Sequence, residues 1–438
     1  MEAGLGQFGD HRLGCGGKFL MERLVEVGQS GVRVRALGGD RAGEMRITRF
    51  LRNERVTTAE MFSTAAARTA GLVAGKHILA IQDTTTLRDD GETKSVLLHP
   101  TIAVDALDGA LYGLVHAEVL RRTGGKKATR KQRPFAEKES RRWLTGAEMA
   151  ATLKLAGAAC VTVIADREGD IYEEFACKPL DVELLIRAAQ DRRLADGRML
   201  FGCTDHLPAL GRIAVELPAA PGRKARTATL ELRASAVAIA RPGRPKQEAV
   251  ALPEKVTVNL VEAREIDPPE GVEAAHWRLL TTHAVSSLAD AKMIVGFYRR
   301  RWVIEQLFRT AKTQGFNIEA VRIADETPFV NLAAATLIAA IQVMQMVQAR
   351  DGNTLRPLED VFDPADQPAL EAICDELEGS TERQQNPHPK GSLAYATWVC
   401  ARLGGWNCYY GKPGPVVILR GFLRFRAMAH GWNLGRLL

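Results

Sequence analysis

The sequence predicts a mixed α/β protein whose central sheet is flanked by helical regions. Between residues 76 and 188, short apolar runs typical of buried strands alternate with helical patterns. Between residues 189 and 280, apolar and polar residues alternate and Pro and Arg are frequent, which suits antiparallel strands. We therefore expect a helical N-terminal domain over residues 1–70, an α/β domain over 71–370 with a β-rich insertion over 189–280, and a helical C-terminal segment over 371–438.

The composition is that of an ordinary globular protein with a basic balance. The chain has 438 residues, of which 46% are hydrophobic and 25% charged, so general disorder is not expected. Its formal net charge of +7 favours an acidic partner, of which nucleic acid is the commonest. Seven scattered cysteines, none in a CxxC spacing, argue against a zinc site and a disulfide framework. The apolar stretch over residues 329–347 contains Asn331 and Gln345 and predicts a buried core helix, so we expect a cytosolic protein with no membrane partner.

The N-terminal domain is predicted to consist of short helices carrying many cations. Four arginines are spaced so that several of them can share one helix face: Arg46, Arg49, Arg52 and Arg55. Thr57 or Thr58 is a suitable N-cap for the helix that follows. A solvated surface and a DNA-contacting module both remain open for this region.

Two acidic residues follow apolar strand patterns in the α/β domain. "HILAIQDTTTL" predicts a strand that ends on Asp83, and "CVTVIADREGD" predicts one that ends on Asp166. Each could be a turn or cap residue, although Asp170 is the more natural cap for the helix after Asp166. Further elements are predicted as a hairpin over 99–123, a mobile basic loop over 121–133, a helix over 137–157 and a strand over 182–188.

A basic helix over residues 298–312 carries a single acid, Glu305, among four arginines and a lysine. At helical spacing Tyr298, Arg301, Glu305 and Lys312 fall within about 60° of one another, with Arg309 beside them. The neighbouring face is apolar and is expected to pack on the sheet through Met293, Phe297, Val303, Ile304, Leu307 and Ala311. An ion pair of Glu305 with Arg301 or Arg309 would explain the acid, but not the excess of cations.

Asp83, Asp166 and Glu305 together would form a site for hard cations. Carboxylate oxygens are the ligands that Mg²⁺ and Mn²⁺ prefer. Two such ions can activate an attacking oxygen and stabilise the leaving oxygen of a phosphoryl displacement. Cations on the same helix edge would hold DNA phosphates. The pattern therefore predicts a site that cuts and joins nucleic acid.

These motifs resemble the IS4-type DDE transposases, and among them the Tn5-like enzymes. The signature Y-x2-R-x3-E-x6-K is matched at Tyr298, Arg301, Glu305 and Lys312, and "LAIQDTTTL" and "VIADREGDI" match the two aspartate motifs. "EKESRRWL" and "GSLAYATWVCARLGGW" also resemble family segments. The resemblance implies an RNase H-like catalytic core in which Asp83, Asp166 and Glu305 bind two Mg²⁺ ions, for which Mn²⁺ would substitute. It also implies an N-terminal DNA-binding domain and a C-terminal dimerisation segment.

The same resemblance implies the reaction and further DNA contacts. Each transposon end would be nicked, closed to a hairpin, reopened and joined to target DNA by a DNA-bound homodimer in the bacterial cytoplasm, at the nucleoid. Trp277 matches a Trp that supports a flipped base, and Arg187 matches an Arg near the same DNA. Tyr298, Arg301 and Lys312 would contact phosphates. A nuclease that cuts without rejoining, and an inactive DNA-binding derivative, are the alternatives.

Overall fold

A single mixed sheet forms the centre of the protein. The computed structural model describes residues 4–27, 32–89, 94–123, 135–217, 224–243, 252–313, 315–354 and 356–435. In this part of the chain ten strands form one sheet: nine pair in the order β2-β3-β1-β5-β6-β10-β9-β8-β7, and β4, outside this order, pairs with β3. Their bounds are β1 His77–Gln82, β2 Thr85–Asp89, β3 Lys94–Asp105, β4 Leu111–Thr123, β5 Cys160–Ala165, β6 Glu183–Arg187, β7 Gly211–Leu217, β8 Arg226–Ala240, β9 Lys255–Glu265 and β10 His276–Thr281.

Most neighbouring strands run antiparallel, but the centre of the sheet is parallel. β1 pairs with β5, and β5 with β6, in parallel. The predicted strands at Asp83, Asp166 and 182–188 and the predicted hairpin are all confirmed. β2, directly after Asp83, was not predicted. The loop predicted over 121–133 lies outside the described residues from position 124 onward, while β4 extends to Thr123.

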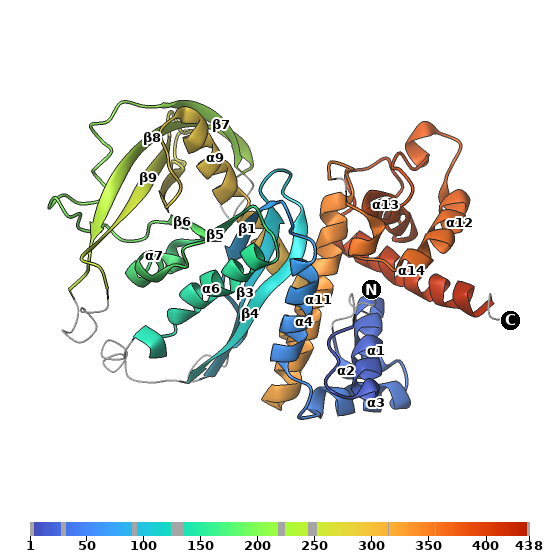
Figure 1. Ribbon diagram of the computed structural model, residues 1–438. Helices are drawn as coiled ribbons and strands as arrows, with labels where there is room; N and C mark the ends of the chain where they lie inside the picture. Colours follow the sequence, from blue (N-terminus) through green and yellow to red (C-terminus); the bar gives the residue numbers. More distant parts are fainter. Residues whose placement is uncertain are drawn as a thin grey trace.

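The region predicted as a β-rich insertion is indeed built of strands, and these strands extend the central sheet. β10 pairs with β6 in an antiparallel manner, and β9, β8 and β7 follow outward from it. Figure 1 shows β7, β8 and β9 at the end of the sheet away from α4 and α11, with α9 beside them. Residues 189–280 therefore contribute β10, which borders the parallel centre at β6.

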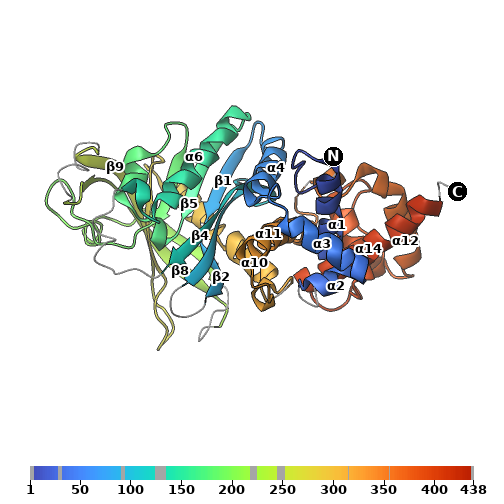
Figure 2. The same ribbon diagram turned by 90° about the horizontal axis from the view of Figure 1, so that it is seen from below.

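The helices are α1 His11–Val27, α2 Val34–Gly38, α3 Arg41–Arg52, α4 Thr58–Ala70, α6 Arg141–Leu155, α7 Tyr172–Cys177, α9 Leu288–Arg299, α10 Trp302–Ala311, α11 Glu326–Ala349, α12 Gln367–Leu377, α13 Leu393–Leu403 and α14 Pro415–Gly435. α6 and α7 cover one face of the sheet, and α4, α10 and α11 cover the other, between the sheet and the remaining helices (Figures 1 and 2). A mixed sheet flanked by helices in this way is consistent with an RNase H-like domain.

α11 connects the sheet to the helices of both ends of the chain. Asn331 donates hydrogen bonds to the carbonyls of Leu51 and Val56, and Gln345 donates one to the carbonyl of Tyr112. Among the described helices it is the one long and apolar enough to cross a membrane, yet nearly all of its most apolar stretch is buried inside the protein. The prediction of a buried core helix is confirmed.

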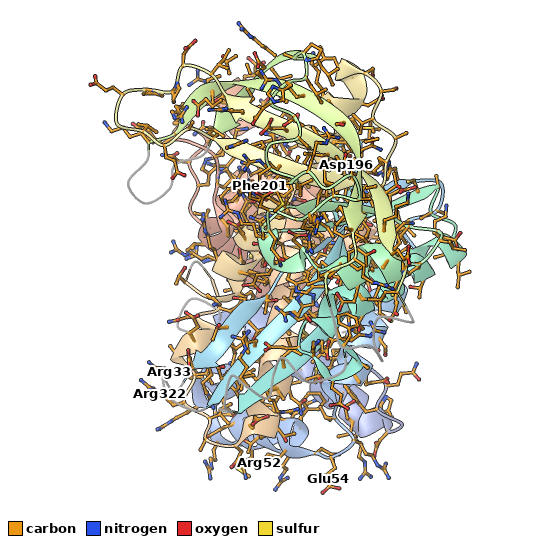
Figure 3. The ribbon with its side chains drawn as sticks, turned by 90° about the vertical axis from the view of Figure 1, so that its left-hand side faces the viewer. Arg33, Arg52, Glu54, Asp196, Phe201 and Arg322 are labelled. Carbon is orange, nitrogen blue, oxygen red and sulfur yellow. The ribbon has the colours of Figure 1, made fainter. Side chains whose placement is uncertain are left out.

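The arginines of α3 are exposed, which fits either a solvated or a DNA-contacting surface. Ile47, Phe50 and Leu51 are buried on one side of α3, and its arginines are exposed on the other. Arg55 is also exposed, but it lies beyond the last residue of α3. Thr57 is the N-cap of α4 and accepts a hydrogen bond from the backbone N–H of Glu60. Figure 3 shows Arg33, Arg52 and Arg322 at the same end of the molecule.

Candidate active site

The sheet register places Asp83 and Asp166 side by side. β1 and β5 run parallel, with Ile81 opposite Ile164, and each aspartate lies two residues further along its strand. Adjacent strands are about 4.8 Å apart, so the two carboxylates leave the same edge of the sheet as neighbours. Arg187 comes to the same edge from the next strand, because Ala165 is opposite Ile186.

Strand alternation points both aspartates toward α10. In β1, Leu79 and Ile81 belong to the core on the α10 and α11 side, whereas Ile78 and Ala80 face α6. Successive side chains of a strand alternate between its faces, so Asp83 continues the α10 side. The same alternation in β5 places Asp166 with Ile164. Both acids therefore face the helix that carries Glu305.

The single helix predicted over 298–312 is divided in two. α9 ends at Arg299, and α10 begins at Trp302 after a tighter turn in which the N–H of Arg301 bonds to the carbonyl of Tyr298. Arg301 becomes the N-cap residue of α10, and Lys312 its C-cap. Most of the predicted apolar face is buried or half-buried, but Met293 is exposed, and its inclusion was wrong.

Arg301 connects two of the three acids. Its side chain is only 11% exposed, and its guanidinium bonds to Asp83 Oδ2 at 2.9 Å and to Glu305 Oε1 at 2.5 Å. Its Nε atom is buried and has no hydrogen-bond partner among the described residues. The local ion pair of Glu305 with Arg301 is thus present. The same guanidinium also bonds to Asp83, which follows β1.

Burial makes the ionised form of Asp83 costly. Its side chain is 15% exposed, and its pKa is raised to about 7, first by burial and then by the nearby charge of Asp166. Arg301 and the N–H of Thr84 act in the opposite direction, and Glu305 adds a smaller rise. The raised pKa shows that the three acids act on one another and that Arg301 only partly compensates for their repulsion.

Asp166, rather than Asp170, caps a turn of the backbone. Asp166 caps the turn at Arg167–Gly169 through the N–H of Glu168, so it does have a local structural role. Asp170 caps no helix, since α7 begins after Ile171 without a side-chain cap. It is instead fully buried and accepts hydrogen bonds from Arg192 and from the backbone of Ala189 and Gln190. The prediction of Asp170 as the cap is therefore wrong.

The other predicted DNA-contacting residues lie around this edge with different degrees of exposure. Lys312 pairs with Glu319 at 2.8 Å, and Arg309 is exposed without an ion-pair partner in the described part of the chain. Arg187 donates a hydrogen bond to the carbonyl of His276, directly before Trp277. Trp277 is half-buried, and its ring centroid is 5.9 Å from that of the buried Tyr298.

The three acids do not form a closed ligand cage. Among the residues that the structure describes, no three acidic, histidine or cysteine side chains are grouped so that they could hold a metal ion. Arg301 instead supplies the positive charge between Asp83 and Glu305. The donor set nevertheless suits a hard divalent cation, because such an ion prefers carboxylate oxygens and would remove the repulsion that raises the pKa of Asp83. Arg301 would then have to release at least one carboxylate.

A second arginine near the acids was not predicted. Arg142 of α6 is buried and bonds to the side chains of Thr84 and Glu168, next to the two aspartates. It stands beside Arg141 in the sequence, and only the packing of α6 distinguishes the two. The local pattern contains no signal that selects Arg142.

Comparison with known families agrees with this geometry. The family model described as a transposase DDE domain matches residues 75–341, more than half of the chain. The matched range contains the central strands, all three acids and Arg301. With two aspartates on adjacent parallel strands and a glutamate on the covering helix, the chain belongs to the transposase DDE-domain family.

Proposed function

We propose that this transposase is an IS4-type, Tn5-like enzyme that frees transposon ends through a hairpin intermediate and joins them to target DNA. One observation carries the proposal: Asp83 and Asp166 leave adjacent parallel strands in register, and Arg301 connects Asp83 to Glu305 on the covering helix. Membership of the family supports transposase activity and the use of divalent metal ions in general. The specific pathway is the part that we propose.

Asp83, Asp166 and Glu305 would hold two Mg²⁺ ions, or Mn²⁺ in their place. When bound, such ions activate the attacking oxygen and stabilise the leaving oxygen of an in-line displacement. The carboxylates would fix the position of the DNA strand relative to this edge of the sheet. Arg301 would neutralise charge between the acids in the free protein and turn toward a phosphate when DNA binds.

The DNA would run along the edge formed by the ends of β1, β5, β6 and α10. Exposed Arg309 and half-buried Lys312 are placed for phosphate contacts, and Arg187 supports the backbone before Trp277. Trp277 would stack on a base that leaves the duplex during hairpin formation. In the free protein Tyr298 is buried, with its ring 5.9 Å from that of Trp277, so its hydroxyl would reach a phosphate only after the packing around Tyr298 opens.

The terminal regions would bind DNA and a second copy of the chain. Residues 1–70 expose the α3 cations, which suits recognition of a transposon end. Residues 371–438 include α14, which exposes Val416, Met428 and Trp432. Exposed apolar side chains of this kind suit a dimer contact formed on DNA. The catalytic domain would then comprise residues 71–370.

A cleavage and joining assay tests this function. The wild type and an Asp166→Ala variant are each mixed with Mg²⁺, the element's own end as a labelled duplex, and a supercoiled target. Nicked, hairpin and joined products from the wild type alone are expected. Arg141→Met is a matched control, since Arg141 pairs with Glu148 on the surface of α6.

The other outcomes separate the alternatives. Nicking without joining would favour a nuclease, and a nick without a hairpin would refute the proposed intermediate. DNA binding without cleavage by either protein would favour an inactive derivative. Cleavage by Asp166→Ala at the wild-type rate would remove Asp166 from the reaction.

A further inference from the structure

Arg142 is a buried cation on the side of the sheet opposite to Arg301. It lies in the first turn of α6, and its side chain is 6% exposed. Nε donates to Thr84 Oγ1 at 3.1 Å, Nη1 to the carbonyl of Glu139 at 3.0 Å, and Nη2 to Glu168 Oε2 at 3.0 Å. A guanidinium so enclosed is unsuited to a surface phosphate contact, and its N–H groups are already directed at the hydroxyl of Thr84, the carbonyl of Glu139 and the exposed carboxylate of Glu168.

Arg142 bonds to two residues, Thr84 and Glu168, whose backbone N–H groups bond to the carboxylates of Asp83 and Asp166. The N–H of Thr84 donates to Asp83 Oδ1 at 2.7 Å, and the N–H of Glu168 donates to Asp166 Oδ1 at 2.9 Å. Arg142 bonds to the side chains of the same Thr84 and Glu168. One guanidinium therefore ties the turn that carries Asp83 to the turn that carries Asp166.

The Thr84 hydroxyl is held from a second side by a buried histidine. Oγ1 lies 2.9 Å from His99 Nδ1, while His99 Nε2 lies 3.2 Å from Gln82 Oε1. Burial holds the pKa of His99 well below its ordinary value, so the ring is neutral. An amide oxygen can only accept, so Nε2 carries the proton, and the Thr84 hydroxyl donates to Nδ1 while it accepts from Arg142. Each polar atom of this chain thus has a defined role.

Close packing of α6 on β1 brings Arg142 within hydrogen-bond distance of Thr84. A Cβ atom added to Gly146 would lie 2.1 Å from Gln82 Oε1, so the α6 backbone at Gly146 packs directly on the side chain of Gln82 in β1. Arg142 lies one turn earlier on the same helix. Trp143, which is fully buried, packs edge-on against His99 with ring centroids 4.6 Å apart.

From these contacts we infer that Arg142 is a positioning residue, whose bonds to Thr84 and Glu168 fix the separation of Asp83 and Asp166 for the reaction. The inference rests on the proposed role of the two aspartates as ligands of a divalent cation. Residues that orient metal ligands typically change metal affinity by about 10-fold to 100-fold when they are removed. Arg142 would act through Thr84 and Glu168 and touch neither the cation nor the DNA.

The test measures Mn²⁺ binding directly. Purified protein with the element's end duplex is titrated with Mn²⁺, and the free ion is followed by electron paramagnetic resonance well below the unfolding temperature. Arg142→Met keeps most of the stem and removes the charge, and Thr84→Val removes only the hydroxyl. Both should weaken Mn²⁺ binding at least about tenfold, and the double variant should be no weaker than the weaker single variant. Thr84→Ser, which keeps the hydroxyl, and Arg141→Met should both bind as the wild type does.

The outcomes separate this inference from the proposed function. If Arg142→Met and Thr84→Val bind Mn²⁺ as the wild type does, the inference is overturned, even if both variants unfold at lower temperature. Effects that multiply in the double variant would also overturn it, because the two side chains would then act separately. If Asp83→Asn binds Mn²⁺ as well as the wild type, or the wild type binds none, the proposed metal site itself fails and the inference falls with it.

Discussion

Replacing Asp83 with Asn should stabilise the metal-free protein at alkaline pH. The Asp83 carboxyl is mostly buried beside Asp166, and its pKa is raised to about 7. The folded state therefore binds this proton more tightly than the unfolded chain, whose carboxyl has the ordinary value of 3.8. The resulting stabilisation is complete below pH 3.8 and is lost as the pH rises to about 7. Asparagine has nearly the same shape and loses nothing over that range.

The size of the effect follows from the two pKa values. A shift of about three units corresponds to about 4 kcal/mol over the full range, at about 1.4 kcal/mol per unit. Between pH 5.5 and pH 8, the wild type should lose about 2 kcal/mol of unfolding free energy through this one group. Asp83→Asn also loses the ion pair with Arg301, but the effect of that pair is already contained in the pKa of about 7, and Arg301 keeps its bond to Glu305.

Urea unfolding of both proteins at the two pH values, with EDTA present, measures this difference. The unfolding free energy of Asp83→Asn minus that of the wild type should rise by about 2 kcal/mol from pH 5.5 to pH 8. The other titrating groups are the same in both proteins and cancel in this difference. Mg²⁺ added at pH 8 should then stabilise the wild type and not the variant. A difference that stays constant between pH 5.5 and pH 8 would refute the account of Asp83 as a buried, repelled carboxylate.

Three further predictions concern other parts of the chain. Arg192→Met should lower the unfolding free energy by about 3–5 kcal/mol in urea unfolding, because it leaves the Asp170 charge buried and unpaired; a loss below about 1 kcal/mol would contradict this. Trp277→Ala should slow hairpin formation about tenfold on denaturing gels and leave the first nick unchanged; equal slowing of both steps would assign Trp277 to packing alone. Lys312→Ala should change stability by less than about 1 kcal/mol, because its partner Glu319 is exposed. The same variant should reduce the slope of DNA affinity against salt by about one, and an unchanged slope would exclude a phosphate contact.

The strands and their terminal acids could be predicted because their signal is local. β1 and β5 are continuous apolar runs, and an acid at the end of such a run marks the sheet edge whatever the rest of the chain does. The strands of the insertion were likewise predictable from alternation. Their continuity with the central sheet was not, because it depends on β10 pairing with β6, nearly a hundred residues away.

Helical periodicity correctly predicts that Arg301 and Glu305 are neighbours, but it wrongly assumes one continuous helix over 298–312. Arg301 and Glu305 are one turn apart, as spacing requires, and they do bond to each other. One straight helix would put Tyr298 and Lys312 on the same edge, but the helix divides before Trp302 and ends before Lys312. Lys312 then turns to Glu319, a partner that the helix pattern does not contain.

By itself, the sequence determined the strands β1, β5 and β6 and the acids that follow β1 and β5, because these depend on residues close along the chain. Only the tertiary structure decided that Arg301 reaches Asp83, that Asp170 pairs with Arg192, and that Arg142, rather than Arg141, contacts both aspartate turns. The physical reason is that a buried charge takes its partner from whatever the packing brings within hydrogen-bond distance. In this protein those partners come from strands and helices that are far apart in the chain.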